Sequence, residues 1–184
     1  MKSANFPSVT TVLEKYSPYG NINKRVLELA QVRGTTVHSA CFTICRGLPL
    51  FPHPLPEYLP RINSFRRWFD QNVDEVLEIE PELVDHDLRY KGHPDLIIVS
   101  RNFGLCLPDI KTAEMYQPIW VAQLSAYYML AKKIGYVSEF TFSLMLDSGG
   151  GLPRIVPLQD PEKHFFGFFH ALQAHQYFLG MGVI

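Results

Sequence analysis

The sequence predicts an α/β protein, in which helices pack against a β-sheet. Residues 24–73 have mainly helical patterns of apolar side chains, and residues 76–112 change to the two-residue period of strands. From residue 118 onward, helical and strand patterns alternate. This order of helices, strands, helix, strands and helix is typical of a sheet with helices packed on it.

Helical patterns on either side of a proline-rich segment dominate residues 24–73. Residues 24–32 are expected to form a helix that ends at Arg33 and Gly34, after which Thr35 or Thr36 would cap a second helix reaching Cys45. Residues 47–60 contain five prolines and are expected to form an irregular surface loop. Residues 62–73 are expected to form a short helix.

Strand patterns follow. Residues 76–80 alternate, which predicts Leu77 and Ile79 on one face of a strand. Residues 82–88 are expected to be extended and to lead into a turn at residues 90–92. Strands are then predicted at residues 95–100 and 105–112, joined by a turn at residues 102–104. Short turns between consecutive strands favour an antiparallel meander.

The remaining elements have recognisable ends. A helix is expected to begin near Pro118 and to stop at Gly135. Strands are expected at residues 140–146 and 154–158, separated by a glycine-rich turn at residues 148–151. Asp160 and Pro161 would open a last helix that is apolar nearly all round.

Composition indicates one globular domain spanning residues 1–184. Apolar residues make up 47% of the chain and charged residues 19%, which is ordinary for a soluble protein. The formal charge of −1 excludes a strongly basic nucleic-acid binder, so any such binding needs lysines and arginines gathered on one face. No apolar run is long enough to span a membrane, and the first ten residues lack a signal-peptide core.

The three cysteines are expected to be reduced thiols, which favours a cytoplasmic location. Cys41 and Cys45 are expected in the core. No CxxC pair is present, so the sequence gives little support for zinc and predicts no iron–sulfur cluster.

Charged residues interrupt two otherwise apolar strands. Asp95 begins one strand and Asp109 lies in the next, so the hairpin between them can bring the two acids together. Lys111 shares a face with Asp109, because side chains two apart on a strand point the same way. Two carboxylates with a lysine suit a divalent ion, Mg²⁺ or Mn²⁺, and a phosphate. The ion would lower the pKa of a bound water, and the lysine would steady the developing charge.

These motifs resemble the PD-(D/E)XK nuclease signature, since residues 93–95 read HPD and residues 109–111 read DIK. RGTTVH at residues 33–38 and the Gln-x-x-x-Tyr pattern at residues 123–127 resemble its RecB-like branch. That branch includes CRISPR-associated RecB-like exonucleases, mitochondrial genome maintenance exonuclease and phage exonucleases. The resemblance covers residues 33 to about 130, and more weakly residues 7–18. It implies a restriction-endonuclease-like fold, with a mixed β-sheet core flanked by helices.

The resemblance also implies roles for particular residues. Lys111 would be the catalytic lysine, and Gln123 and Tyr127, one helical turn apart, would reach the site or a nucleotide. An acid in the strand before Asp95 would assist, for which Glu80 fits the spacing better than Glu82. The implied metal ligands are the side chains of His38, Asp95 and Asp109 and the carbonyl of Ile110. The candidate contacts to nucleic acid are Arg33, Arg66, Arg67, Trp68 and Lys132.

Structural interpretations of the same residues remain open. His38 could be a buried histidine bonded to a carbonyl, and Asp109 and Lys111 could form an ordinary ion pair. Gln123 and Tyr127 could simply lie at the boundary between their helix and solvent. Trp68 could belong to an amphipathic helix, and Lys132 could complement a helix dipole.

The leading hypothesis is a metal-dependent DNA nuclease, an exonuclease acting on single strands or duplex ends in DNA repair or recombination, encoded by a phage or prophage. A second hypothesis is a catalytically inactive nucleic-acid-binding protein that keeps the nuclease fold. A third is an unrelated α/β protein in which the motifs match by chance.

Overall fold

A five-stranded mixed β-sheet forms the middle layer of the protein in a computed structural model that describes residues 6–17, 23–50 and 55–182. Its strands are β1 (Val73–Ile79), β4 (Leu96–Ser100), β5 (Gly104–Lys111), β6 (Phe140–Met145) and β7 (Arg154–Pro157). A separate two-stranded sheet consists of β2 (Leu83–Asp85) and β3 (Tyr90–Gly92). The helices are α1 (Val9–Leu13), the 3-10 helix η1 (Glu14–Tyr16), α2 (Lys24–Cys45), α3 (Leu59–Asn72), α4 (Ile119–Lys133) and α5 (Pro161–Gly180). The predicted α/β architecture, a mixed sheet flanked by helices, is confirmed.

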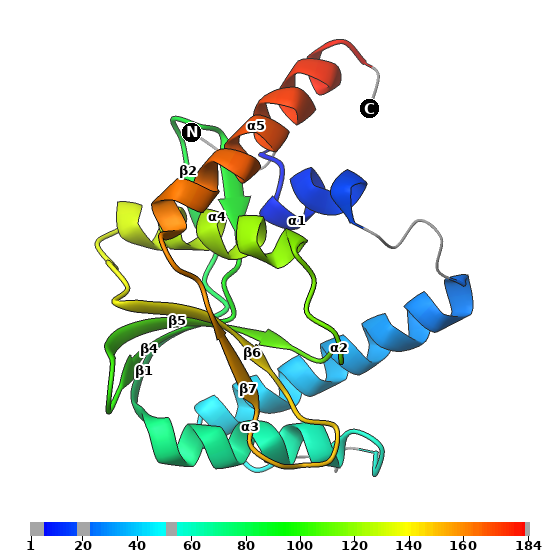
Figure 1. The fold of residues 1–184 in the computed structure, drawn as a ribbon, viewed down its shortest axis with the longest axis vertical. Helices are drawn as coiled ribbons and strands as arrows, with labels where there is room; N and C mark the ends of the chain where they lie inside the picture. The colour runs from blue at the N-terminus through cyan, green and yellow to red at the C-terminus, as the bar shows by residue number, and fades with distance from the viewer. Residues whose placement is uncertain (1–5, 18–22, 51–54, 183–184) are drawn as a thin grey trace.

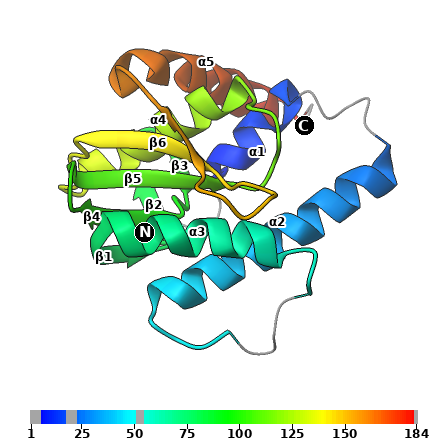
Figure 2. The same ribbon diagram turned by 60° about the horizontal axis from the view of Figure 1, so that its bottom comes forward.

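Helices cover both faces of the sheet. In Figures 1 and 2, α2 and α3 lie on one side of the strands, and α1, α4 and α5 lie on the other. Two apolar clusters correspond to these layers. One joins α2 and α3 to the sheet and contains Phe65 and Trp68, and the other joins α1, α4 and α5 to it and contains Leu124 and Phe168. The central strands β4, β5 and β6 are therefore buried between two helical layers, whereas the edge strand β7 is largely exposed.

The main sheet has the order β1-β4-β5-β6-β7, in which β5 and β6 run parallel and the other pairs are antiparallel. The expected meander is present as β1-β4-β5, although the small β2-β3 sheet is inserted between β1 and β4. Parallel pairing requires a crossover connection, and α4 is the helix of that crossover. One face of the sheet therefore receives α4 directly after the end of β5.

The expectation of two helices between residues 24 and 45 was wrong, because α2 is continuous through Gly34. A glycine inside a helix costs only about 1 kcal/mol relative to alanine. Burial of Val37, Cys41 and Ile44 on the following turns offsets this cost. One long helix therefore carries both Arg33 and His38. Cys41 is in the core as predicted, with Cys45 packed against it.

The expected turn at residues 90–92 was also wrong. These residues form β3, which pairs with β2, and the chain reverses before it, where Arg89 adopts a φ of 59°. Buried Asp85 holds this reversal together, because its Oδ1 accepts the backbone N–H groups of Asp87 and Leu88, both at 2.9 Å. Lys133, at the end of α4, also donates to Asp85 at 2.6 Å.

Strand β1 departs from simple alternation. Its pairing with β4 is interrupted between Val76 and Glu78. Leu77 packs against the cluster under α4, whereas Ile79 packs against the cluster under α2 and α3. The prediction that these two side chains share a face was therefore wrong, since an irregularity in register changes which residues point to each side.

The proline-rich segment is shorter than expected. Helix α3 begins at Leu59, with Pro60 in its first turn, where a missing N–H costs no helical hydrogen bond. Pro52 and Pro54 lie outside the described residues. Within the described chain, none of the helices has the length and apolar character needed to cross a membrane.

Gly92 lies where β3 meets α4. A Cβ atom placed on it would be 2.8 Å from Cε1 of Tyr127 and 2.9 Å from Cδ1 of Leu130. Both of these side chains are buried. The absence of a side chain at Gly92 therefore allows α4 to approach the strand that leads into Asp95.

We expect Gly92→Ala to lower the free energy of unfolding by about 1–3 kcal/mol, the usual cost of overpacking. Urea denaturation measures this change. Gly180→Ala is the matched control, because a Cβ there meets open space. Equal stability of the wild type and Gly92→Ala would show that α4 moves away freely.

Candidate active site

Asp95 and Asp109 come together at neighbouring strands of the main sheet. Asp95 directly precedes β4, and Asp109 lies in β5, which pairs with β4. Oδ2 of Asp95 accepts the backbone N–H of Ile110 at 2.6 Å, which ties the first acid to the residue after the second. Both acids are buried, with 9% and 3% of their surface exposed.

His38 reaches Asp95 from helix α2. Its Nδ1 lies 3.3 Å from Oδ1 of Asp95. The imidazole is partly exposed, so one side contacts the buried carboxylate while the other faces solvent. The sequence left open a histidine bonded to a backbone carbonyl, but in the structure a carboxylate is its partner.

Lys111 connects the second acid to helix α4. Its Nζ lies 2.6 Å from Oδ2 of Asp109 and donates to Oε1 of Gln123 at 2.8 Å. Nε2 of Gln123 donates in turn to the hydroxyl of Tyr127 at 3.2 Å. The ring of Trp120 lies under the same ammonium group, 4.9 Å from Nζ to its centroid, a distance suited to a cation–π contact. Lys111 is thus held from two sides.

The two carboxyl groups have opposite pKa shifts. Burial raises the pKa of Asp109, and Lys111 offsets this only in part while Asp95 raises it further. Burial also raises the pKa of Asp95, but His38, Lys111 and the N–H of Ile110 outweigh burial and hold the pKa below its usual range. Of the two neighbouring acids, Asp95 is the one that ionises more readily.

His38 has a raised pKa. Burial, the largest single influence, lowers it, but the charge and hydrogen bond of Asp95 together more than offset that effect. The imidazole is therefore a better base than an isolated histidine, and its contact with Asp95 strengthens when it is protonated.

A cavity of about 980 Å³ opens beside these groups. We call it the larger cavity. It lies between α1, α2, the end of β5 and the start of α4. Its polar lining includes Arg33, His38, Lys111, Thr112 and Gln123. Asp95 and Asp109 lie behind this wall, so a molecule in the cavity meets Lys111 and His38 first.

Arg33 is part of the cavity wall, on the same helix as His38. Its Nε is buried and has no hydrogen-bond partner among the described residues. A buried guanidinium nitrogen without a partner is costly. Arg33 is therefore well placed to meet an anion in the larger cavity.

The acids expected to assist from the preceding strand lie elsewhere. The Glu80 side chain is exposed, although its backbone N–H donates to the carbonyl of Asp95 at 2.9 Å. Glu82 pairs with Lys91 at 2.8 Å and lies 3.6 Å from His93. The structure therefore brings the backbone of Glu80 to Asp95, whereas the Glu82 side chain pairs elsewhere.

Trp68, a predicted contact to nucleic acid, is 3% exposed and packs edge-on against Phe142 in the core. Arg66 and Arg67 are exposed on α3 and do not line the larger cavity. Lys132 pairs with Glu162 at 2.7 Å near the C-terminal end of α4, whereas Gln123 lies in its first half. The structure thus separates Arg66, Arg67, Trp68 and Lys132 from the site and keeps only Arg33 beside it.

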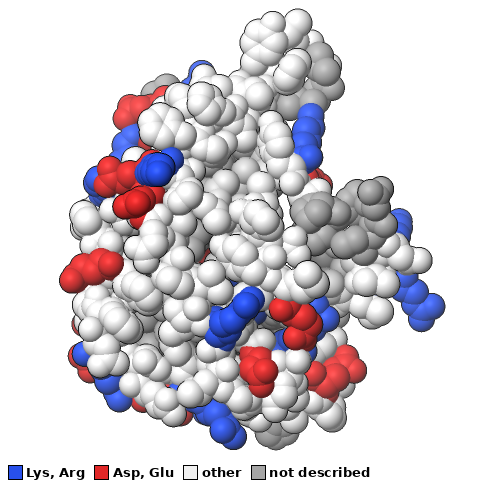
Figure 3. Space-filling model, in the orientation of Figure 1, with Lys and Arg blue, Asp and Glu red and all other residues white. Residues whose placement is uncertain are grey.

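Positive charge is not gathered on the face shown in Figure 3. Basic and acidic side chains lie side by side along its edge and lower part, and uncharged side chains cover most of its middle. Any contact with a polyanion on this face therefore depends on a few individual basic side chains and not on a basic patch.

Two contacts at the site were not predicted from the sequence. Trp120 precedes Gln123 by nearly one helical turn, and this spacing was a usable signal for a shared face. Arg61 donates its Nε to the carbonyl of Thr112 at 3.1 Å and pairs with Glu114, fixing the chain just after Lys111. No local pattern indicated that contact, since 51 residues separate Arg61 from Thr112.

The donor groups at this site suit a hard divalent cation. Two carboxylates, an imidazole and a nearby backbone carbonyl are the ligand types that Mg²⁺ and Mn²⁺ accept. Oδ2 of Asp109 is buried without a hydrogen bond, although Lys111 is close enough for an ion pair. In the arrangement observed, however, the acids contact His38, Lys111 and Ile110. Among the described residues, no three His, Cys, Asp or Glu side chains converge as metal ligands would.

Comparison with solved structures finds an alkaline exonuclease (LHK-Exo) from Laribacter hongkongensis. It is 11% identical with a TM-score of 0.43, and the match covers 95% of this chain and 91% of that chain. LHK-Exo in complex with dAMP also matches, at 11% identity and a TM-score of 0.43, over 96% and 92% of the two chains. At this TM-score and identity, the likeness does not establish a family or an activity. Neither family models nor the sequences of curated proteins give a match.

We expect Lys111→Met to destabilise the metal-free protein by about 3–5 kcal/mol, because it leaves the buried Asp109 carboxylate without a cation. The double variant Lys111→Met/Asp109→Asn should lose much less, since it removes both charges. Urea denaturation in the presence of a chelator measures the four proteins of this cycle. Additive losses would mean that the two charges do not interact.

Proposed function

We propose that this protein is a metal-dependent nuclease that hydrolyses phosphodiester bonds in DNA, and that it acts as an exonuclease. The observation that supports the proposal best is the arrangement of Asp95, Asp109 and Lys111 beside a cavity of about 980 Å³. Two buried acids with a lysine held by Gln123 have little structural purpose by themselves, because burying charges costs more than burying apolar groups of equal size.

In this proposal Lys111 is the catalytic lysine. Its ammonium group points to the cavity wall and stabilises negative charge that develops on a phosphate placed there. Gln123 and Tyr127 act through Lys111, because their hydrogen-bond chain fixes the position of its Nζ. Arg33 supplies a second positive group to the phosphate.

His38, Asp95, Asp109 and the carbonyl of Ile110 would hold the cation, Mg²⁺ or Mn²⁺. A divalent ion supplies charge neutralisation for the phosphate and makes water a stronger nucleophile at neutral pH. In the structure Lys111 and His38 contact these two acids, so holding a cation would require those contacts to change. Glu80 stays the candidate assisting acid on the resemblance of the sequence motifs, although its side chain is exposed and only its backbone N–H bonds to Asp95.

The substrate and setting follow from the resemblance of the sequence motifs to RecB-like nucleases. On that basis we propose DNA as the substrate, as single strands or duplex ends, and DNA repair or recombination as the process. An origin in a phage or prophage rests on the same resemblance.

A second candidate function is nucleic-acid binding without cleavage. The pairing of each acid with a basic side chain favours it. In agreement, no three metal-ligating side chains converge among the described residues. Such a protein would bind DNA and hydrolyse none. We place it second because the set of Asp95, Asp109 and Lys111 is complete.

We expect Lys111→Ala to lower the rate of DNA hydrolysis by at least about 100-fold while the protein stays folded, because it removes the group that stabilises the developing charge. Digestion of end-labelled single- and double-stranded DNA with Mg²⁺ or Mn²⁺ measures this, beside a closed circular substrate that only an endonuclease cuts. Arg101→Ala, an exposed change at the β4-β5 turn, is the control and should retain activity. Full cleavage by Lys111→Ala would refute the mechanism.

We expect calorimetric titration with Mn²⁺ to show one binding event in the wild type and to lose it in Asp95→Asn. The amide removes the negative charge while keeping the shape of the side chain, so a loss reports ligation and not unfolding. Circular dichroism of both proteins verifies the fold. Unchanged Mn²⁺ binding in Asp95→Asn would remove Asp95 from the ligand set.

A further inference from the structure

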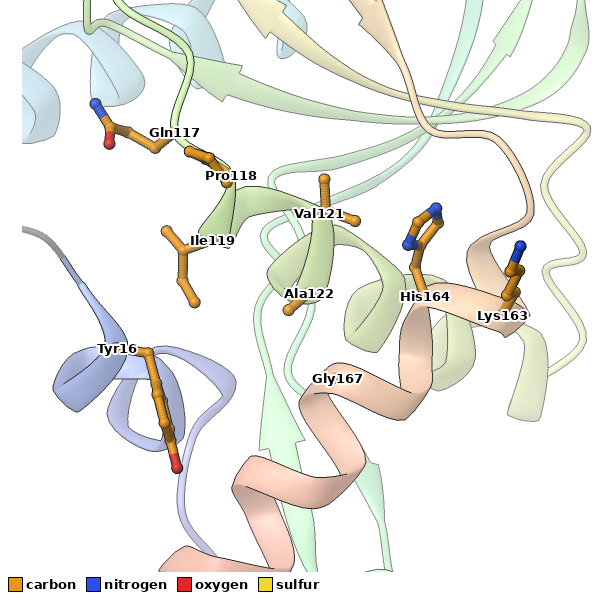
Figure 4. A pocket seen from close by; sticks show the side chains of 9 residues that line it. All are labelled: Tyr16, Gln117, Pro118, Ile119, Val121, Ala122, Lys163, His164 and Gly167. Carbon is orange, nitrogen blue, oxygen red and sulfur yellow. The ribbon is translucent and has the colours of Figure 1, made fainter.

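A second cavity, of about 600 Å³, lies between η1, the start of α4 and the start of α5. We call it the smaller cavity. Figure 4 shows its lining side chains coming from these three parts of the chain, with Tyr16 on one side and His164 and Lys163 on the other. Its volume lies in the range of about 300–1,000 Å³ that is usual for ligand sites.

The floor of the smaller cavity is aliphatic, and its ends are aromatic and basic. Ile119, Val121 and Ala122 of α4 form the apolar part. Tyr16 is 56% exposed, so its ring is available for stacking. None of the residues that line the cavity is acidic. This combination fits a flat ring joined to an anion.

The basic end remains available to an anion. Lys163 and His164 occupy the first turn of α5 and are both exposed. Glu162, the acidic residue next to them, pairs with Lys132 at 2.7 Å instead. The positive charge of Lys163 therefore faces the cavity without being neutralised by its acidic neighbour.

Gly167 leaves the cavity open from the α5 side. It lies inside a helix, where glycine is a poor choice compared with alanine or leucine. A Cβ atom placed on it meets no described atom within 4 Å, and its φ is not one that requires glycine. Packing within the described chain therefore does not explain this residue, whereas close approach of a ligand does.

The two cavities adjoin each other. Gln117 and Ile119 line both of them, at the start of α4. A chain-like ligand that occupies the larger cavity beside Lys111 can therefore continue over these residues into the smaller one. A single small ligand would not need two adjoining cavities.

We propose that the smaller cavity binds one nucleotide of a single nucleic-acid strand whose neighbouring phosphate lies in the larger cavity. The base stacks on Tyr16 over the aliphatic floor, and Lys163 and His164 meet the phosphate of that same nucleotide. Stacking on an aromatic ring accepts any base, so the subsite contributes affinity without reading sequence. This inference rests on the proposed nuclease function, because it extends the path of the same substrate.

The test uses the full chain and fluorescence polarisation of a labelled 12-nucleotide single-stranded DNA, with Ca²⁺ in place of Mg²⁺ to limit cleavage. The variants are Tyr16→Ala, which removes the stacking ring, and Gly167→Leu, which fills the cavity. Tyr177→Ala and Gly180→Leu are matched controls, because Tyr177 is similarly exposed and Gly180 similarly open on the same helix. Hydrolysis of a small substrate, the p-nitrophenyl ester of thymidine 5′-phosphate, measures the catalytic groups separately.

We expect each cavity variant to weaken binding of the 12-nucleotide strand about 10-fold, with hydrolysis of the small ester unchanged and both controls like the wild type. Gly167→Leu should melt no lower than the wild type, because leucine favours the helix more than glycine does. Weaker binding with equal or higher thermal stability therefore reports a blocked site and not a damaged fold.

Two results would overturn the inference. One is wild-type affinity in both cavity variants, and the other is a wild-type protein that binds no oligonucleotide. The proposed function is judged separately. If the wild type hydrolyses the ester and cleaves DNA in either case, the nuclease function stands without this subsite. If the wild type binds the strand in a Tyr16-dependent way but hydrolyses nothing, the subsite stands and the nuclease function fails.

Discussion

The balance of charge around Asp95 and Asp109 is the constraint on which this site depends. Two buried carboxylates on neighbouring strands repel each other, so each must contact a positive group or a donor. His38 from α2 and Lys111 from β5 meet that need, and they belong to one helical layer and to the sheet it covers. The position of α2 relative to the sheet therefore affects the chemistry of the acids.

Helix α4 completes this arrangement from the other layer. Gln123 holds the lysine, and Tyr127 holds the glutamine, while Gly92 permits the helix to lie against the strand that leads into Asp95. The orientation of Lys111 is thus set by packing of whole elements and not by one hydrogen bond. Displacement of α4 would change the site even if every polar residue were kept.

The parts of the structure that were predicted from the sequence depend on local rules. Strand periodicity and one short turn predicted that Asp95 lies near Asp109. The two-residue spacing in the strand predicted the side on which Lys111 lies, and the four-residue spacing in the helix predicted that Gln123 and Tyr127 share a face. Where the structure places predicted residues away from the site, distant contacts decide. Burial of Trp68 by Phe142 and the pairing of Lys132 with Glu162 involve residues far apart in the sequence, which no spacing reveals.

The parallel pairing of β5 with β6 places several of the polar groups on one uninterrupted stretch of chain. Asp109, Lys111, Gln123 and Tyr127 all lie between the start of β5 and the end of α4. The glycine-rich connection between β6 and β7 lies after that stretch, at the surface. Splitting the polypeptide there would yield two fragments, of which the first retains all four groups and the second contributes α5 with Lys163 and Gly167. Co-expression of such halves offers a way to separate the apparatus around the acids from the neighbouring cavity.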